Sequence, residues 1–199
     1  MELDGKKVAF VVANEGVEEV ELTEPWRAVL HAGGSPELIA PERGTVQAFN
    51  HLDRGSQFVV DRTLDDADAG EYDAVVLPGG VANADTLRTR QPAVQFVSQI
   101  HSAGKPVGVI CHGAWTLVEA DLVRGRQITS WPSLRTDIEN AGGDWVDEEV
   151  VVDGQFVSSR KPDDLEAFCS TIVERFAQDG TTRSADAQES KTAADYPSV

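Results

Sequence analysis

The chain has 199 residues, of which 34 are acidic and 17 basic, so its formal net charge is −17. Such a negative surface repels nucleic acids and anionic membranes, and we expect neither as a partner. The length and a hydrophobic content of 41% fit a single α/β domain with a sizeable core, and no apolar run is long enough to cross a bilayer.

In the first half of the chain, short apolar runs alternate with segments of helical spacing. Residues 6–14 are typical of a strand buried on both faces, and the spacing over residues 17–32 predicts a helix that ends at Gly33-Gly34. The elements expected next are a strand at 35–40, a small β excursion with a turn at 45–62, and a strand at 72–77 that runs into Pro78-Gly79-Gly80.

The second half continues the alternation and predicts a mainly parallel sheet covered by helices on both faces. The expected elements are a helix at 84–103, a central strand at 105–110, a helix from 112, a short strand at 127–130, a helix at 133–141, a strand pair at 148–160 and a helix at 162–177. We assign residues 1–177 to one domain, and predict a disordered tail for residues 178–199, which are polar and lack periodicity.

The charge has two interpretations. Only five of the basic residues are lysine, and acid-rich, lysine-poor surfaces suit high salt, where screening relieves self-repulsion. An ordinary acidic cytoplasmic protein fits the same composition. The first ten residues lack a signal-peptide pattern, and two cysteines in such a chain are expected to be reduced thiols, so we predict a cytoplasmic protein.

Cys111 stands where an apolar strand ends and a helical pattern begins, in the sequence VGVICHG. This arrangement is typical of a nucleophile elbow, which presents a reactive side chain at a helix N-terminus and lowers the pKa of a thiol there. Backbone N–H groups at His112, Gly79 and Gly80 are candidates for binding an oxyanion. The alternative for Cys111 is a small buried hydrophobe, which is the interpretation that we favour for Cys169 in the last helix.

The motifs GVEEVEL, VVLPGG, GKPVGVICHGAW and VSSRKPDDL occur in this order over residues 6–176. Together they resemble the ThiJ/PfpI superfamily and, within it, the PfpI-like intracellular protease branch. The resemblance implies a flavodoxin-like three-layer sandwich and a homo-oligomer, either a dimer or a hexamer. Members of the family include peptidases, glyoxalases, deglycases, chaperones and stress proteins, so the resemblance defines the site better than the substrate.

The resemblance implies roles for individual residues. Cys111 corresponds to the family nucleophile, and His112 to its adjacent histidine, which acts as a general base or orients a shared proton. Glu21 corresponds to a buried carboxylate that hydrogen-bonds the cysteine. Glu18 is its companion, since residues three apart lie on one helical face. Burial and the nearby sulfur are expected to raise the pKa of Glu21.

Asp85 stands where some relatives carry a glutamate that reaches the histidine of a neighbouring subunit. The resemblance therefore implies an active site that two subunits share. From the sequence alone, Asp85 also fits the N-cap of a helix that starts near Thr86. Trp115 and Trp131 are candidates for the pocket mouth or for packing. Arg160, with the acidic residues that follow it in SSRKPDDL, is expected to have a structural role.

We therefore predict a cysteine-dependent hydrolase-like enzyme that acts on peptides or on reactive dicarbonyls and glycated adducts in stress protection. One alternative is a stress chaperone that senses oxidation through Cys111. A weaker alternative is a glutamine amidotransferase, whose histidine would lie far downstream, whereas no histidine follows His112. No metal-ligand spacing and no nucleotide fingerprint is present, so we expect neither a metal nor another cofactor.

Overall fold

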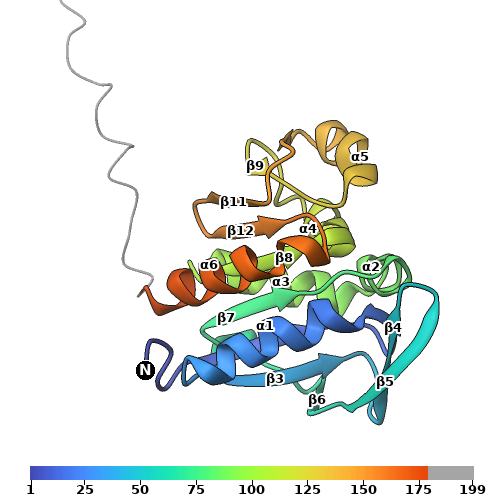
Figure 1. Cartoon of the computed structure of the whole chain (residues 1–199), viewed down its shortest axis with the longest axis vertical. Coiled ribbons are helices and arrows are strands. Elements are labelled where there is room, and N and C mark those ends of the chain that lie inside the picture. The colour runs from blue at the N-terminus through green and yellow to red at the C-terminus, as the bar shows by residue number, and fades with distance from the viewer. Residues whose placement is uncertain (179–199) are drawn as a thin grey trace, which may run out of the picture.

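The computed structural model describes residues 1–178, and its centre is a seven-stranded sheet (Figure 1). All neighbouring strands are parallel except the first pair, which forms an antiparallel hairpin. In spatial order the strands are β11 (Val150–Asp153), β12 (Phe156–Ser159), β8 (Val107–Ile110), β7 (Ala74–Leu77), β1 (Lys7–Val11), β3 (Ser35–Ala40) and β6 (Arg62–Thr63). The mainly parallel sheet predicted from the sequence is confirmed, whereas residues 179–199 of the predicted tail lie outside the described residues.

The central strands are buried on both faces, as their uninterrupted apolar sequences predict. In β1, Ala9 and Val11 belong to one hydrophobic core, while Val8 and Phe10 belong to the other. This division follows from strand geometry, because successive side chains point to opposite faces of the sheet. Each face therefore needs its own layer of helices.

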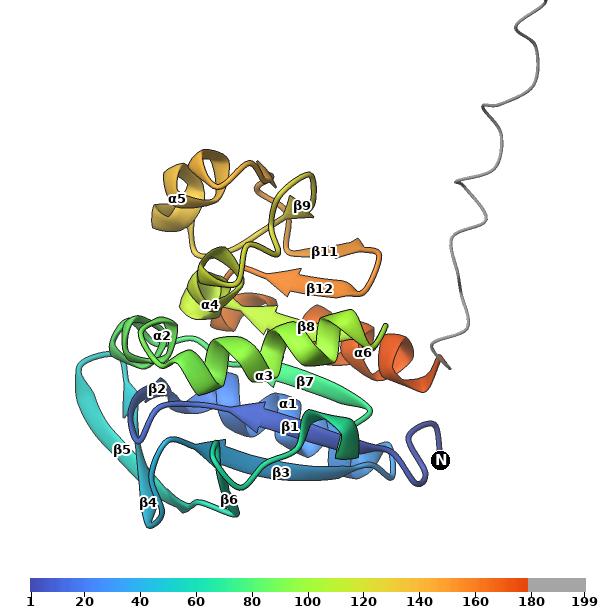
Figure 2. The same ribbon diagram turned by 180° about the vertical axis from the view of Figure 1, so that it is seen from behind.

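Two helices cover each face of the sheet (Figures 1 and 2). On one face lie α1 (Glu19–His31) and α6 (Leu165–Ala177), and on the other lie α3 (Gln91–Ser102) and α4 (Ala114–Glu119). The result is the expected flavodoxin-like three-layer sandwich. None of the helices within residues 1–178 combines the length and the hydrophobicity of a bilayer-spanning segment.

A small second sheet lies at the carboxyl edge of the central one. Its strands are β2 (Glu15–Glu18), β4 (Thr45–Asn50) and β5 (Asp53–Val59), of which β2 follows the end of β1 and β4 follows the end of β3. Glu19, at the start of α1, fastens β5 by accepting hydrogen bonds from the backbone N–H (2.6 Å) and the hydroxyl (2.8 Å) of Ser56. This sheet forms one wall of the cavity described below.

Two short strands and a helix form a cap next to α4. They are the short strands β9 (Gln127–Ile128) and β10 (Asp144–Trp145), which pair in parallel, and the helix α5 (Arg135–Asn140). Figure 2 shows this cap beside α4 and the β11–β12 hairpin.

Two of the predicted elements differ from the structure. The segment 84–103, expected to be one helix, forms α2 (Val81–Arg88) and then α3, which carries Pro92 in its first turn. Proline lacks the N–H that an uninterrupted helix would need at that position, so the chain starts a new helix. Residues 17–18, expected to begin the first helix, instead belong to β2, because this strand pairs with β4.

Candidate active site

The candidate site lies at the carboxyl ends of β1, β7 and β8, where the strand order reverses its direction. From β1 the chain runs outward to β3 and β6, and then returns to build β7, β8 and β12 on the other side. Ligands bind in open α/β sheets at such a switch point. A cavity of about 620 Å³ opens here. Its lining consists of Glu15, Gly16, Glu18, Glu21, Phe49, His51, Leu52, Gly80, Val81, Ala82, Asp85, Cys111, His112, Trp115, Trp131 and Pro162.

Cys111 occupies a nucleophile elbow directly after β8. Its backbone adopts φ = 61°, a left-handed conformation that non-glycine residues rarely adopt. Gly113 makes the turn possible, because a Cβ on this residue would lie 2.5 Å from the carbonyl oxygen of Leu77. The carbonyl of Cys111 accepts a hydrogen bond from the backbone N–H of Trp131 (3.3 Å). The elbow is thus held on both sides, and only 6% of Cys111 is exposed at the end of the cavity.

His112 is the nearest candidate base. Its Nδ1 lies 3.2 Å from the Sγ of Cys111. The ring stacks against Trp131, with centroids 5.7 Å apart, and meets the edge of Trp115 at 5.3 Å. Burial lowers the pKa of His112, so the imidazole is neutral at pH 7 and its Nδ1 is able to accept the thiol proton. His112 is therefore placed to act on the thiol proton, although it directly follows Cys111 in the chain.

Glu21 is fully buried beneath the elbow, as the resemblance to the family implies. Its Oε2 accepts a hydrogen bond from the backbone N–H of Gly79 (2.8 Å), whereas Oε1 has no hydrogen-bond partner. Burial raises the pKa of Glu21 to about 8; contacts with Cys111 and Gly79 act in the opposite direction, and the charge of Glu18 adds to the rise. The carboxyl group is therefore mostly protonated at pH 7 and can donate a hydrogen bond.

The thiol of Cys111 departs from the sequence-based expectation. Burial, followed by the charge of the Glu21 carboxylate, raises the pKa of the Cys111 thiol, and the backbone N–H groups of His112 and Gly80 act in the opposite direction. The expected lowering by a helix N-terminus is wrong, because a 3₁₀ turn at Cys111–Gly113 precedes α4 and desolvation outweighs the backbone dipoles. Since Cys111 and Glu21 repel each other when both are charged, they lose their protons as a coupled pair.

Gly79 and Gly80 have different roles. The N–H of Gly79 is already bound to Glu21, so the expectation that it helps to bind an oxyanion is wrong. Gly79 instead allows Cys111 and Glu21 to lie close together. A Cβ on residue 79 would lie 2.7 Å from the Cβ of Cys111 and closer still to Oε2 of Glu21. The N–H groups of Gly80 and His112 lie near Sγ and remain available for an oxyanion.

Glu18 lines the cavity, but not for the reason that the sequence suggested. It is the last residue of β2 and precedes α1, so the two glutamates do not share a helical face. Its carboxylate accepts a hydrogen bond from the backbone N–H of His51 (3.1 Å), which belongs to the turn between β4 and β5. Glu18 therefore stands on the wall of the cavity, whereas Glu21 lies at its floor.

Asp85 lines the same cavity from an exposed position within α2. The helix begins at Val81 with Gly80 as its N-cap, so the alternative role of Asp85 as an N-cap is wrong. No direct contact with His112 is formed within the described part of this chain. Whether Asp85 contacts a neighbouring subunit stays a prediction.

Asn83 is a positioning residue that the sequence analysis missed. It is fully buried, and its Oδ1 accepts a hydrogen bond from Ala13 N–H (2.6 Å). Its Nδ2 donates to the carbonyls of Pro78 (3.0 Å) and Gly79 (2.9 Å). Asn83 thus joins the end of β1 to the loop that follows β7. The signal was available: Asn83 precedes Leu87 by four residues and so shares its buried helical face.

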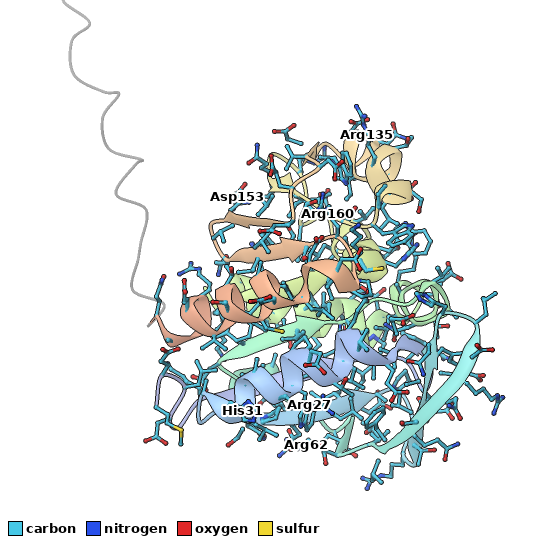
Figure 3. All side chains as sticks on the ribbon, in the orientation of Figure 1. Arg27, His31, Arg62, Arg135, Asp153 and Arg160 are labelled. Atoms are coloured by element: carbon cyan, nitrogen blue, oxygen red, sulfur yellow. The ribbon has the colours of Figure 1, made fainter. Side chains whose placement is uncertain are left out.

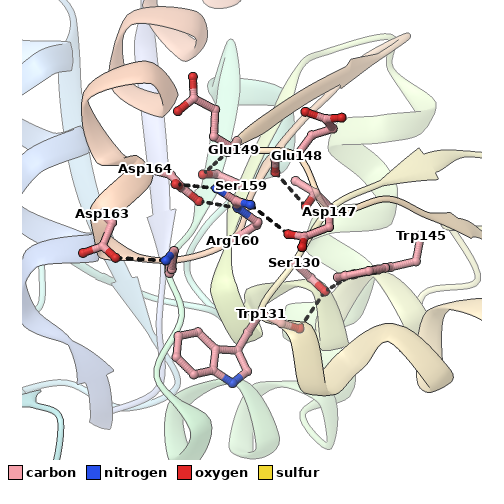
Figure 4. A network of polar contacts seen from close by, with 12 residues as sticks. Ser130, Trp131, Trp145, Asp147, Glu148, Glu149, Ser159, Arg160, Asp163 and Asp164 are labelled. Carbon is pink, nitrogen blue, oxygen red and sulfur yellow. Dashed lines mark hydrogen bonds and ion pairs between the residues drawn. The ribbon is translucent and has the colours of Figure 1, made fainter.

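Polar contacts hold the backbone at Trp131 (Figure 4), whose ring stacks against His112. The indole Nε1 of Trp145 donates to the hydroxyl of Ser130 (3.0 Å), and this hydroxyl donates to the carbonyl of Trp131 (3.0 Å). Both Trp131 and Trp115 line the cavity, which is the first of the two roles considered for them.

Arg160 has the structural role that the sequence predicts (Figures 3 and 4). Its Nε and Nη2 donate to the two oxygens of the buried Asp164 at 2.8 and 3.0 Å, and its Nη1 donates to Asp147 at 2.8 Å. The arginine therefore fastens the start of the last helix to the loop before β11.

Cys169 differs from Cys111 in its surroundings. It is half-buried on α6 and packs against the hydrophobic core, as expected, but it also lines a separate cavity of about 500 Å³. Burial, with a smaller effect of Glu24, raises the pKa of Cys169 to about 12. No histidine contact comparable to that of Cys111 is formed by Cys169 within residues 1–178. The described residues also contain no group of three or more His, Cys, Asp or Glu side chains arranged to hold a metal ion.

Comparison with known proteins gives consistent matches. The model of the DJ-1/PfpI family matches residues 6–175. Deglycase PH1704 of Pyrococcus horikoshii is 43% identical over 167 residues, which cover 84% of this chain and 97% of the relative. General stress protein 18 of Bacillus subtilis is 42% identical over 166 residues, which cover 82% and 94% of the two chains. A two-domain protein of Anabaena variabilis, with DJ-1/ThiJ/PfpI-like and ferritin-like domains, superposes with a TM-score of 0.81 at 34% identity, over 90% of this chain and 52% of that one.

Proposed function

Because this chain belongs to the DJ-1/PfpI family, we propose that it is a cysteine-dependent deglycase, which removes dicarbonyl adducts from amines and thiols. One observation carries the proposal. The thiol of Cys111 lies at the buried end of a small cavity, between the neutral imidazole of His112 and the protonated carboxyl of Glu21. The names of two relatives, one a deglycase and one a stress protein, support the same function.

The proposed reaction begins at the carbon that joins a dicarbonyl to an amine. The thiolate of Cys111 attacks this carbon, a C–S bond forms, and the C–N bond breaks as the amine leaves with a proton. The product is a hemithioacetal on Sγ. A proton then moves from the sulfur-bearing carbon to the neighbouring carbonyl carbon, and the hydroxyl proton moves from the oxygen of the first carbon to the oxygen of the second, which converts the hemithioacetal into a thioester of a hydroxy acid. Water then hydrolyses the thioester to a hydroxy acid and restores the thiol, so the sum is adduct plus water giving amine plus hydroxy acid.

Each step needs a proton carrier, and two are within reach. His112 Nδ1, at 3.2 Å from Sγ, takes the thiol proton and returns it to the leaving amine. Glu21, whose pKa is raised to about 8 by burial, exchanges protons near neutral pH and suits the transfer between carbons. The N–H groups of Gly80 and His112 stabilise the negative oxygen that develops on the attacked carbon.

The size of the cavity favours small adducts over folded or extended polypeptides. Peptide hydrolysis needs an open groove, whereas only 6% of Cys111 is exposed and the aromatic rings of Trp115 and Trp131 stand beside His112. A glutamine amidotransferase would need a downstream histidine, and His112 is the last histidine of the chain. Oxidation sensing at Cys111 is a separate hypothesis. A turnover assay distinguishes it from the deglycase function, because a sensor alone does not turn over substrate.

The test compares turnover of three substrates: a methylglyoxal adduct of an N-acetylated lysine, the corresponding thiol adduct, and an unfolded protein. We expect amine release faster than the spontaneous reversal of the adduct, no cleavage of the unfolded protein, and loss of activity in Cys111→Ser. Cys169→Ser is the matched control and should keep its activity. If free methylglyoxal is consumed but adducts decay only at the spontaneous rate, the enzyme is a glyoxalase. If Cys111→Ser loses no activity, the nucleophile assignment is wrong.

A further inference from the structure

His112 needs a fixed orientation to serve as the base of the proposed reaction. Its Nδ1 lies 3.2 Å from the Sγ of Cys111, and among the described residues its ring forms no other hydrogen bond. The ring nitrogens of a histidine are usually oriented by the hydrogen bond that the second nitrogen makes. Within one chain, the orientation of His112 must therefore come from packing. An inference about this packing rests on the proposed function, because it concerns the base of that reaction.

The packing comes from two tryptophan rings. Trp115 meets the ring of His112 edge-on, with centroids 5.3 Å apart, and Trp131 stacks on it at 5.7 Å. Protein interiors are close-packed, so an imidazole that packs against two rings has little freedom to turn while both rings stay in place. The contacts that hold the two indoles therefore also maintain the distance between Nδ1 and Sγ.

Trp115 is held from outside the cavity. Its indole Nε1 donates a hydrogen bond to Oδ2 of Asp137 at 2.8 Å. Asp137 lies in the first turn of α5, which belongs to the cap that Figure 2 shows beside α4. The guanidinium group of Arg88, the last residue of α2, lies over the same indole, 5.5 Å from the ring centroid. The indole is thus fixed both at its polar edge and on a face.

The carboxylate of Asp137 has few other tasks. It takes part in no ion pair within residues 1–178, and the indole of Trp115 is its hydrogen-bond partner. The N-cap of α5 is Leu134, and no side chain caps this helix. A carboxylate in a first turn also interacts with the helix dipole, which requires its charge. A hydrogen bond to an indole requires only an acceptor oxygen, so asparagine separates the two roles.

The second tryptophan is held by the same cap. The hydroxyl of Ser130 donates to the carbonyl of Trp131 at 3.0 Å and accepts from the Nε1 of Trp145 at 3.0 Å. The backbone N–H of Trp131 in turn donates to the carbonyl of Cys111 at 3.3 Å. The cap therefore reaches the elbow by two routes, one through the indole of Trp115 and one through the backbone at Trp131.

We infer that Asp137 is a positioning residue for the proposed reaction, and that it fixes the imidazole of His112 against Cys111 through the indole of Trp115. Without the carboxylate oxygen, the indole loses its polar anchor, and the imidazole is free to turn toward the cavity and water. Trp145 supports the same imidazole by the second route.

The test follows the imidazole of His112 by NMR titration of the histidine ring resonances, which are assigned with His112→Gln. Asp137→Ala removes the acceptor, whereas Asp137→Asn keeps an acceptor oxygen without the charge. Trp145→Phe keeps an aromatic ring without the N–H. Ile138→Val is the matched control, because it removes one methylene group from a fully buried neighbour of Asp137 and so loosens α5 without removing a hydrogen bond.

Burial lowers the pKa of His112 in the native protein, so an imidazole that turns toward water should titrate at a higher pH, nearer the ordinary value of about 6.5. We expect this rise in Asp137→Ala and Trp145→Phe, but not in Asp137→Asn or Ile138→Val. Loss of the Asp137 charge alone would lower the pKa of a neighbouring histidine, which is the opposite direction. The other ionisable groups around the site stay the same in these variants: Cys111, Glu21, Glu18, Asp85 and Arg88.

Turnover gives a second readout. Asp137 does not line the cavity, so Asp137→Ala should lower kcat about tenfold and leave KM within about twofold of the native value. Asp137→Asn should restore most of the kcat.

An unchanged titration of His112 in Asp137→Ala overturns the inference, as does an equal shift in Asp137→Asn or in Ile138→Val. An active enzyme whose kcat does not fall in Asp137→Ala also overturns it. The titration needs no turnover, so its result is independent of the deglycase assay. A native protein that processes no adduct, while its variants show the expected shifts, would refute the proposed function alone. An active deglycase with unchanged titrations would refute the positioning role alone.

Discussion

Replacing Glu21 with Gln should change the pH dependence of stability. Glu21 is fully buried, and burial raises its pKa to about 8, whereas the same carboxyl titrates at about 4.3 in an unfolded chain. Between these two values the folded protein holds a proton that the unfolded chain has released. The folded state therefore binds more protons, and the free energy of unfolding falls as the pH rises through this window.

The size of the effect follows from the two pKa values. Each pH unit between them lowers the free energy of unfolding by about 1.4 kcal/mol, so the loss is about 3 to 4 kcal/mol at pH 7 and about 5 kcal/mol by pH 8. Gln is the suitable replacement, because its carbonyl oxygen can still accept the hydrogen bond from Gly79 N–H (2.8 Å in the native protein). Its amide does not titrate, so this component of the pH dependence disappears.

The assay is urea unfolding at pH 5, 6, 7 and 8 for the native protein, Glu21→Gln and the control Glu24→Gln. Glu24 lies on the same helix, is exposed, and pairs with Arg27 at 2.6 Å. We expect the stability of Glu21→Gln relative to the native protein to increase steadily from pH 5 to pH 8. Repeating the series in Cys111→Ala removes the coupled thiol. Parallel curves for the native protein and Glu21→Gln would refute the reasoning, because they would mean that Glu21 titrates normally in the folded state.

Three further predictions concern the site. Iodoacetamide at neutral pH should modify Cys111 much faster than Cys169, because only Cys111 has an imidazole nitrogen at 3.2 Å, and equal rates would contradict the nucleophile assignment. Asn83→Ala should lower the free energy of unfolding by on the order of 3 kcal/mol, since it leaves the N–H of Ala13 and the carbonyl of Pro78 unpaired and removes one of two hydrogen bonds to the carbonyl of Gly79, and a urea-measured loss below about 1 kcal/mol would contradict this. If two subunits share the site, mixing Asp85→Ala with Cys111→Ser protomers should restore part of the turnover that each lacks alone; no recovery after verified subunit exchange would assign Asp85 to its own cavity.

The fold was largely predictable because its strands are short, apolar and buried on both faces. Residues 35–40 and 150–159 form the predicted strands almost to the residue. The errors arose where local pattern and tertiary pairing disagree. Residues 17–18 fit the helical spacing of the segment 17–32, yet pairing with β4 makes them part of a strand. The break between α2 and α3 was signalled by Pro92, whose preference for a first helical turn the sequence analysis did not use.

The parts of the site that depend on one stretch of chain were predictable, and those that depend on distant contacts were not. The elbow at Cys111 follows from the change of pattern between strand and helix, and its φ of 61° agrees with that prediction. The N–H of Gly79 illustrates the opposite case. Its sequence neighbours suggest a free donor, but Glu21, which is 58 residues away in the chain, already occupies it. The raised pKa of the thiol likewise depends on distant contacts, because burial of Cys111 and then the charge of Glu21 raise it.

Three features at the floor of this cavity lower the stability of the folded protein, and packing alone explains none of them. Cys111 holds a left-handed backbone conformation, Glu21 buries a carboxyl whose pKa burial raises to about 8, and Oε1 of that carboxyl has no partner. A glycine at the elbow would remove the first cost, and a glutamine or methionine in place of Glu21 would reduce the second. Strained backbone and perturbed carboxyl groups gather at functional sites because the chemistry requires them. The deglycase function that we propose requires a buried proton donor beside a sulfur nucleophile, and this requirement fits the buried carboxyl and the strained elbow.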